Sequence, residues 1–122
     1  MLISVVDYKL GNVQSVLGAI EKLGHDAILT NKLEDFLKSD ALILPGVGAF
    51  GDGMKHLVEF DLIDILNKVI IENKKPILGI CLGMHLFATK GHEFGLHDGL
   101  GWIEGEVKKF ELSSGFKLPH VG

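Results

Sequence analysis

Short apolar runs alternate with stretches of helical periodicity over the first 88 residues of the chain. The apolar runs have the length and composition of strands buried on both faces, and they cover residues 2–6, 25–30, 41–44 and 76–80. Between them, apolar residues recur three or four positions apart, which predicts helices over 13–23, 33–37, 52–58 and 62–70. Strands that alternate with helices predict an α/β fold with a parallel sheet and right-handed crossovers.

Polar residues stand at the predicted starts of three of these helices. Asn12, Asp52 and Asp61 are residue types that cap helices by accepting a hydrogen bond from a free backbone N–H. We therefore expect all three side chains to act as N-caps.

The stretch from 76 to 88 carries the strongest chemical signal. Its predicted strand runs into Gly79-Ile80-Cys81-Leu82-Gly83, and a helical pattern follows. Glycines two residues either side of Cys81 allow a tight strand-to-helix turn without a Cβ clash, which is the geometry of a nucleophile elbow. A lone cysteine is more often a buried structural residue, but this setting favours a nucleophile at a helix N-terminus, where free N–H groups stabilise the thiolate.

Two further segments follow predicted strands and are expected near Cys81, because sites in parallel sheets lie at the carboxyl ends of strands. They are Asp7-Tyr8 and Gly46-Val47-Gly48. Residues 46–51 also match the dinucleotide pattern G-x-G-x-x-G, but they follow the third strand, and the next strand leads to Cys81 instead of an acid. We expect backbone N–H groups of 46–48, together with that of Leu82, to hold an oxyanion; a plain strand-to-helix turn is the alternative.

The histidines supply no obvious catalytic base. A cysteine nucleophile needs a base that an acid usually orients, and no histidine here has Asp or Glu two positions later. His85, four residues after Cys81 on the same helix face, is expected to line the pocket, with a role as base as the alternative. His92 and His97 have no accompanying ligand cluster, so we expect no metal.

Composition narrows the class of protein. The 122 residues allow one domain, and a net charge of −4 without a Lys/Arg block argues against nucleic-acid binding. The single cysteine fits a reducing compartment. No apolar run approaches the roughly 18 residues of a membrane span, and the N-terminus does not resemble a signal peptide. These features together predict a cytoplasmic protein.

The pattern changes after about residue 90, where glycines divide the chain into short extended pieces. Two of these pieces, Gly105 to Phe110 and Phe116 to Val121, predict a β-hairpin at a sheet edge.

Five motifs in a fixed order give the whole chain a family resemblance. They are Asp7-Tyr8-x-x-Gly11-Asn12, LPGVGAFGDGM at 44–54, GICLGM at 79–84, GLGWIEGEV at 99–107 and KLPHVG at 117–122. In these motifs the chain resembles class I glutamine amidotransferases, and among them the glutaminase subunits of imidazole glycerol phosphate synthase. The resemblance implies a flavodoxin-like α/β fold with a parallel or mixed sheet, and no cofactor.

The resemblance also implies roles for individual residues. Cys81 matches the nucleophile that attacks the side-chain amide of glutamine, forming a thioester and releasing ammonia. Gly46-Val47-Gly48 matches the oxyanion strand, with the N–H groups of Val47 and Leu82 as donors and Gly48 in the glutamine pocket. His85 stands where the family usually has a glutamine that contacts the substrate.

The implied partner is a (β/α)-barrel cyclase subunit that receives the ammonia, in a heterodimer of histidine biosynthesis. Asn12, Pro119 and His120 correspond to regions near that interface. Two alternatives remain: a related glutaminase that supplies a surface-sugar amidotransferase, and a non-catalytic truncated product or docking scaffold.

In the family, a His-x-Glu pair completes the catalytic site beyond the position of Gly122. We therefore expect residues 1–122 to be the N-terminal portion of a single amidotransferase domain, with an incomplete sheet. The nucleophile would then lack its base, and the chain would be inactive alone.

Overall fold

The computed structural model describes residues 1–110. Within these residues, the central sheet has four strands, all of them parallel. Its four strands are β1 (Leu2–Val6), β2 (Asp26–Thr30), β3 (Ala41–Leu44) and β4 (Ile77–Gly79), in the order β2-β1-β3-β4. All three pairings are parallel, which confirms the predicted strands; β4 is shorter than the predicted run 76–80. This order is flavodoxin-like, with its switch point between β1 and β3.

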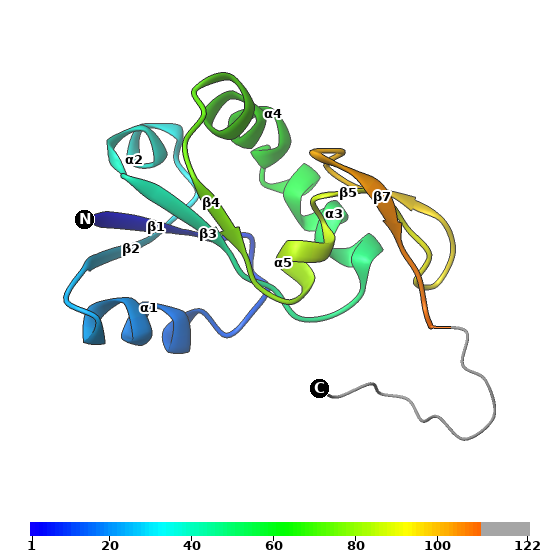
Figure 1. Ribbon diagram of the computed structural model, residues 1–122, viewed down its shortest axis with the longest axis horizontal. Coiled ribbons are helices and arrows are strands. Elements are labelled where there is room, and N and C mark those ends of the chain that lie inside the picture. The colour runs from blue at the N-terminus through cyan, green and yellow to red at the C-terminus, as the bar shows by residue number, and fades with distance from the viewer. Residues whose placement is uncertain (111–122) are drawn as a thin grey trace.

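Helices cover both faces of this sheet (Figure 1). On one face, α1 (Val13–Lys22) packs its apolar stripe, including Ile20, against Val5 and Ile43. On the other face lie α2 (Leu33–Lys38), α4 (Leu62–Leu66) and the π-helical turn η1 (Asn67–Glu72), while α3 (Phe50–Glu59) continues this layer beyond the sheet. The helix predicted over 62–70 is therefore α-helical only in its first half.

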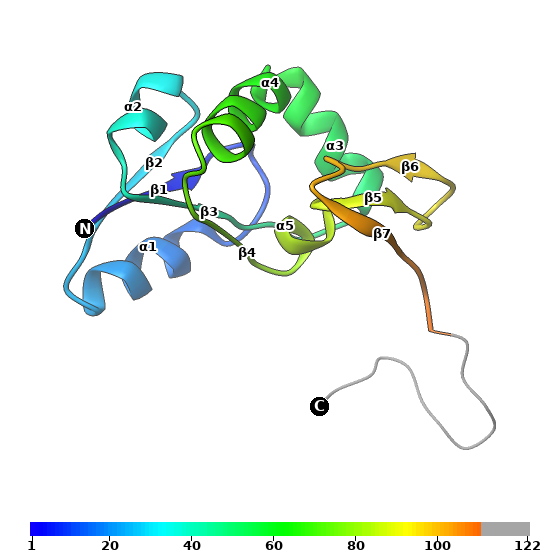
Figure 2. The same ribbon diagram turned by 45° about the horizontal axis from the view of Figure 1, so that its top comes forward.

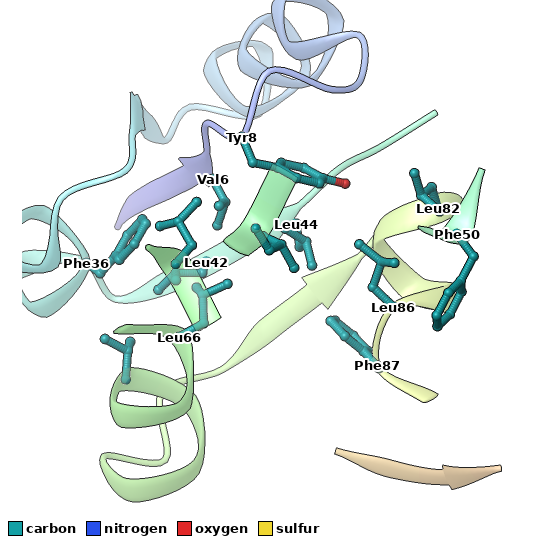
Figure 3. Close-up of a cluster of buried hydrophobic side chains, with 13 residues drawn as sticks. Val6, Tyr8, Phe36, Leu42, Leu44, Phe50, Leu66, Leu82, Leu86 and Phe87 are labelled. Atoms are coloured by element: carbon teal, nitrogen blue, oxygen red, sulfur yellow. The ribbon is translucent and has the colours of Figure 1, made fainter. Parts of the chain in front are cut away.

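The larger part of the core lies on the α2 and α4 face. Because strand side chains alternate, Val6, Leu42 and Leu44 point to this face, whereas Val5 and Ile43 point toward α1. Figure 3 shows these side chains meeting Phe36 and Leu66 at one end of the cluster and Leu82 and Phe50 at the other. One continuous core thus joins the sheet to the segment that follows β4.

The predicted N-cap positions are confirmed for Asn12 and Asp61 without the expected side-chain hydrogen bonds, and the prediction is wrong for Asp52. Asn12 and Asp61 do occupy the N-cap positions of α1 and α4, but neither side chain makes a capping hydrogen bond. Helix α3 begins at Phe50 with Ala49 at its N-cap, so Asp52 lies in the first turn instead. These helices are held by their packed apolar faces, which outweighs the modest contribution of a cap.

A second sheet follows the central one and, within the described part of the chain, has three strands. They are β5 (Ala88–Gly91), β6 (His97–Asp98) and β7 (Ile103–Val107), in the order β6-β5-β7, and α5 (Leu82–His85) joins them to β4. β5 pairs with β6 antiparallel and with β7 parallel.

The predicted hairpin stays a prediction, because its second piece, residues 116–121, lies outside the described part of the chain. In its first piece, residues 105–107 are extended and belong to β7, which pairs with β5. The N–H groups of Trp102 and Ile103 both donate to the Phe87 carbonyl at 2.9 Å, and the Trp102 ring packs on Phe87 with centroids 5.1 Å apart. These long-range contacts align β7 with β5.

We predict that Gly83→Ala destabilises the protein by about 3 kcal/mol, because a Cβ at Gly83 would overlap the Leu44 carbonyl oxygen and force α5 off the end of β3. Gly18→Ala in α1 is the matched control, since its Cβ would meet nothing within 4 Å. We expect this control to be neutral or stabilising by about 0.5–1 kcal/mol. Urea unfolding of both variants makes the comparison, and equal midpoints would contradict the close packing.

Candidate active site around Cys81

Three loops meet at the carboxyl edge of the central sheet. Asp7 and Tyr8 follow β1, residues 45–48 follow β3, and Cys81 follows β4 (Figure 1). Hydrogen bonds join these loops: the Tyr8 hydroxyl donates to the Pro45 carbonyl, and the Leu82 N–H donates to the Gly46 carbonyl at 3.2 Å. The structure therefore brings together the segments that the sequence places after these strands.

Cys81 lies on a sharp turn between β4 and α5. Its backbone has φ 51° and ψ −120°, a conformation that costs a non-glycine residue about 1–3 kcal/mol and persists where the surrounding structure imposes it. The turn is closed by the Gly83 N–H on the Ile80 carbonyl and the Met84 N–H on the Cys81 carbonyl, both at 3.0 Å. Cys81 is exposed, which argues against the alternative of a buried structural cysteine.

The glycines around Cys81 allow this turn through close packing. A Cβ at Gly79 would lie 2.6 Å from the Met84 Cα, and a Cβ at Gly83 would overlap the Leu44 carbonyl oxygen. Neither glycine has a positive φ. The absence of a Cβ is thus what lets α5 lie directly on the ends of β3 and β4.

Tyr8 supports the beginning of the segment opposite Cys81. Its side chain is fully buried and its hydroxyl donates to the Pro45 carbonyl. Burial raises the pKa of Tyr8 well above its ordinary value, so the hydroxyl stays protonated and remains a donor. The Tyr8 carbonyl in turn accepts a hydrogen bond from the His56 ring at 2.7 Å, which ties this loop to α3.

Of the two expected oxyanion donors, the N–H groups of Val47 and Leu82, one is already hydrogen-bonded among the described residues and the other is not. The Leu82 N–H is occupied by the Gly46 carbonyl. Within residues 1–110, no hydrogen bond uses the Val47 N–H, and the Val47 side chain is 59% exposed. Gly48 has φ 112° and open space where a Cβ would stand. The middle of the segment is accessible, while its first peptide group faces Leu82.

The remaining sequence-predicted residues lie around this centre. His85 is half-buried on α5 and lines a hollow of about 210 Å³ with Met84, Ile103 and Glu106. Asn12 is exposed at the start of α1, after the loop that follows β1. Pro119 and His120 lie outside the described residues.

A histidine–carboxylate pair that the sequence did not suggest lies on the second sheet. His92 Nε2 is 2.9 Å from Glu106 Oε1, and Lys108 Nζ is 3.5 Å from Glu106 Oε2. The hydrogen bond from His92 and the nearby charge of Lys108 lower the pKa of Glu106. The pair is separated by 14 residues and forms only because β5 and β7 are in register, so no local pattern could reveal it.

Among residues 1–110, no three His, Cys, Asp or Glu side chains gather in a way that could hold a metal ion. No helix in the same residues combines the length and apolar character needed to cross a membrane.

The fold and the cysteine turn are those of a known enzyme family. The model of the family "Glutamine amidotransferase class-I" matches residues 4–107, and the chain belongs to this family. A crystal structure of a glutamine amidotransferase is similar with a TM-score of 0.69 at 25% sequence identity, over 84% of this chain and 54% of that one.

Individual relatives are closer in sequence. The chain is 52% identical over 121 residues to imidazole glycerol phosphate synthase subunit HisH 2 of Methanococcus maripaludis, covering 99% of this chain and 59% of the relative. It is 49% identical over 121 residues to subunit HisH 1 of Campylobacter jejuni (strain RM1221), covering 99% and 60%. The chain thus spans about three fifths of the length of these curated relatives.

We predict that Tyr8→Phe lowers the free energy of unfolding by about 1–2 kcal/mol near pH 7, because the buried Pro45 carbonyl loses its donor. The folded-state pKa of Tyr8 is raised, so its contribution is present below the unfolded-state pKa of about 10 and declines as pH rises above that value. Urea unfolding at pH 7 and above pH 10 should therefore show a difference between the two proteins that narrows at high pH. A constant difference would exclude the hydroxyl as its cause.

Proposed function

We propose that this chain carries the nucleophile and the oxyanion segment of a glutaminase, which hydrolyses glutamine to glutamate and ammonia. The observation that carries the proposal is the geometry of Cys81: an exposed cysteine in a strained strand-to-helix turn, whose next residue, Leu82, is hydrogen-bonded to Gly46. This is the arrangement of a nucleophile elbow with an oxyanion site next to it. It also disfavours a purely docking role, for which a strained, exposed cysteine has no use.

The chemistry follows from these groups. The Cys81 thiolate attacks the side-chain carbonyl carbon of glutamine, and the carbonyl oxygen becomes an oxyanion. When this intermediate collapses, the C–N bond breaks and the nitrogen leaves as ammonia after taking up a proton, which leaves a glutamyl thioester. Water then hydrolyses the thioester to glutamate and restores the thiol.

Stabilising the oxyanion requires a change at Gly46. Two N–H donors, those of Val47 and Leu82, are proposed to bind it, and the Leu82 N–H now donates to the Gly46 carbonyl. The carbonyl must turn away before Leu82 can serve the substrate. The exposed Val47 and the positive φ of Gly48 give the segment room and freedom for that rotation.

We propose that His85 contacts the substrate glutamine, since it lies on the helix that starts at Cys81 and is partly accessible. The acid–base pair is proposed to lie outside residues 1–110, which join no histidine–carboxylate pair to Cys81 by hydrogen bonds. Residues 1–122 would then be the N-terminal portion of a single amidotransferase domain.

The proposed partner is a cyclase subunit with a (β/α)-barrel fold, of the HisF type, which uses the ammonia in imidazole glycerol phosphate synthesis in the cytoplasm. The names of the relatives, subunits of imidazole glycerol phosphate synthase, support this partner over a surface-sugar amidotransferase. Asn12 is exposed on the loop side of the sheet where Cys81 lies, so it is available for such an interface, for which Pro119 and His120 are further candidates.

We predict that a glutamine analogue carrying an electrophilic ketone forms a covalent adduct at Cys81 and that glutamine protects against it. Cys81 is the single cysteine of the chain, so intact-mass spectrometry reads the modification directly. Cys81→Ser should remain unlabelled. Iodoacetamide is the control for simple exposure: an analogue that reacts no faster than iodoacetamide, and without protection by glutamine, would contradict a glutamine site.

We also predict that the 122-residue chain mixed with its cyclase partner shows no appreciable glutamine turnover, because within residues 1–110 no histidine–carboxylate pair is joined to Cys81 to protonate the departing nitrogen. Ammonia release, followed by a coupled assay, measures this. Turnover that is lost in Cys81→Ala would overturn the placement of the base and would favour His85. His85→Gln, which restores the usual family residue, would then separate a base from a substrate contact.

A further inference from the structure

The proposed oxyanion segment, residues 46–48, is held by contacts on both sides and is exposed in its middle. At the upstream end, Tyr8 holds the Pro45 carbonyl, and Gly46 lies against Leu82, where a Cβ would be 3.1 Å from the Leu82 Cβ. In the middle, Val47 is exposed and Gly48 has no neighbour at its Cβ position within 4 Å. The positions of these two peptide groups therefore depend on the anchors at either end.

The downstream anchor is the first turn of α3. Phe50 is buried, and its ring occupies the space above Gly91 and Gly99 of the second sheet; a Cβ at Gly99 would be 2.9 Å from the Phe50 Cζ. The next residue, Gly51, faces the ring of His97, and its Cβ would lie 2.7 Å from Cε1 and 2.8 Å from both ring nitrogens. Figure 2 shows β6, which begins at His97, beside the start of α3.

His97 is itself held in place. Its Nε2 is 3.2 Å from the Phe94 carbonyl oxygen, and its backbone pairs with Gly91 across β5 and β6. The neighbouring Asp98 is bonded to Lys90 Nζ at 2.9 Å, which ties the same strand pair together. The imidazole ring is thus held in place against Gly51, the second residue of α3.

We propose that His97 is a positioning residue for the oxyanion segment. By packing flat on Gly51, it fixes the first turn of α3 and with it the approach of residues 47–49 to Cys81. The inference rests on the proposed glutaminase function, because it assigns His97 to the same site without contact to the substrate. The second sheet then supports the oxyanion donors through the contact of the His97 ring with Gly51.

The experiment uses four variants and one control variant of the 122-residue chain. His97→Ala removes the ring, and His97→Phe keeps a flat ring on Gly51 without the bond to the Phe94 carbonyl. Gly51→Ala drives a methyl group into the ring, and the double variant Gly51→Ala/His97→Ala removes that clash. Gly18→Ala, a helical glycine with open space at its Cβ position, is the matched control.

Two readouts are measured: the kinetics of glutamine-protected adduct formation at Cys81 with the ketone analogue of glutamine, and hydrogen exchange of the Leu82 amide, which reports its bond to Gly46. For His97→Ala we expect the maximal rate of adduct formation to fall about tenfold, while the analogue concentration that gives half this rate changes less than about twofold, because donors that act in the transition state are misplaced. Exchange at Leu82 should accelerate. His97→Phe should retain most of both properties, and Gly51→Ala alone should be worse than the double variant.

The outcomes separate the two proposals. If Leu82 exchange and the rate of adduct formation are unchanged in His97→Ala, the positioning role is wrong, even if the protein becomes less stable. Additive effects of Gly51→Ala and His97→Ala would also overturn it. If exchange responds as expected but the unsubstituted chain forms no glutamine-protected adduct, the positioning of the segment stands and the glutaminase function fails.

Discussion

The packing of α5 directly onto the ends of β3 and β4 is the constraint on which the rest of the site depends. It needs glycine at 79 and 83, since a Cβ at either position would meet backbone atoms of Met84 or Leu44. With the helix this close, one residue must make the turn, and Cys81 takes the strained conformation with φ 51° and ψ −120° and is exposed. The same packing puts the Leu82 N–H on the Gly46 carbonyl. The close packing of α5 on the two strand ends thus determines the strain, exposure and neighbours of Cys81.

The hydrogen bond from Leu82 to Gly46 gives the site two alternative uses for one donor. In the structure the donor stabilises the loop; for the proposed reaction it must stabilise an oxyanion. A bond between neutral backbone groups contributes only about 0.5–1.5 kcal/mol, whereas one to an anion is stronger. An oxyanion can therefore displace the Gly46 carbonyl, provided that the segment is held at the right distance. In the proposed mechanism, the anchors at Tyr8 and at the first turn of α3 supply this constraint.

The sequence predicts the central part of this structure well and its periphery less well. Local periodicity identifies β1 and α1, and the Cys81 turn follows from its glycines and the change from strand to helix pattern. Residue type located the N-caps Asn12 and Asp61 but not their missing side-chain bonds, and it misplaced the start of α3 at Asp52 because the packing of Phe50 is not visible in the local sequence. The β5–β7 pairing depends on Phe87 meeting Trp102, a long-range contact that no window of sequence contains.

The glycines after residue 90 show how one sequence feature can have two physical causes. Gly95, Gly101 and Gly105 have positive φ, so they are turn and bulge positions, as a glycine-rich stretch suggests. Gly91 and Gly99 do not; Gly91 makes room for the Phe50 ring, and Gly99 makes room for the Ala88 carbonyl and the tip of the same ring. A segment that looks merely loose in sequence is in part a close-packed surface against α3. Because α3 begins directly after residues 46–48, this surface connects the second sheet to the oxyanion segment, although no residue of that sheet belongs to the motif around Cys81.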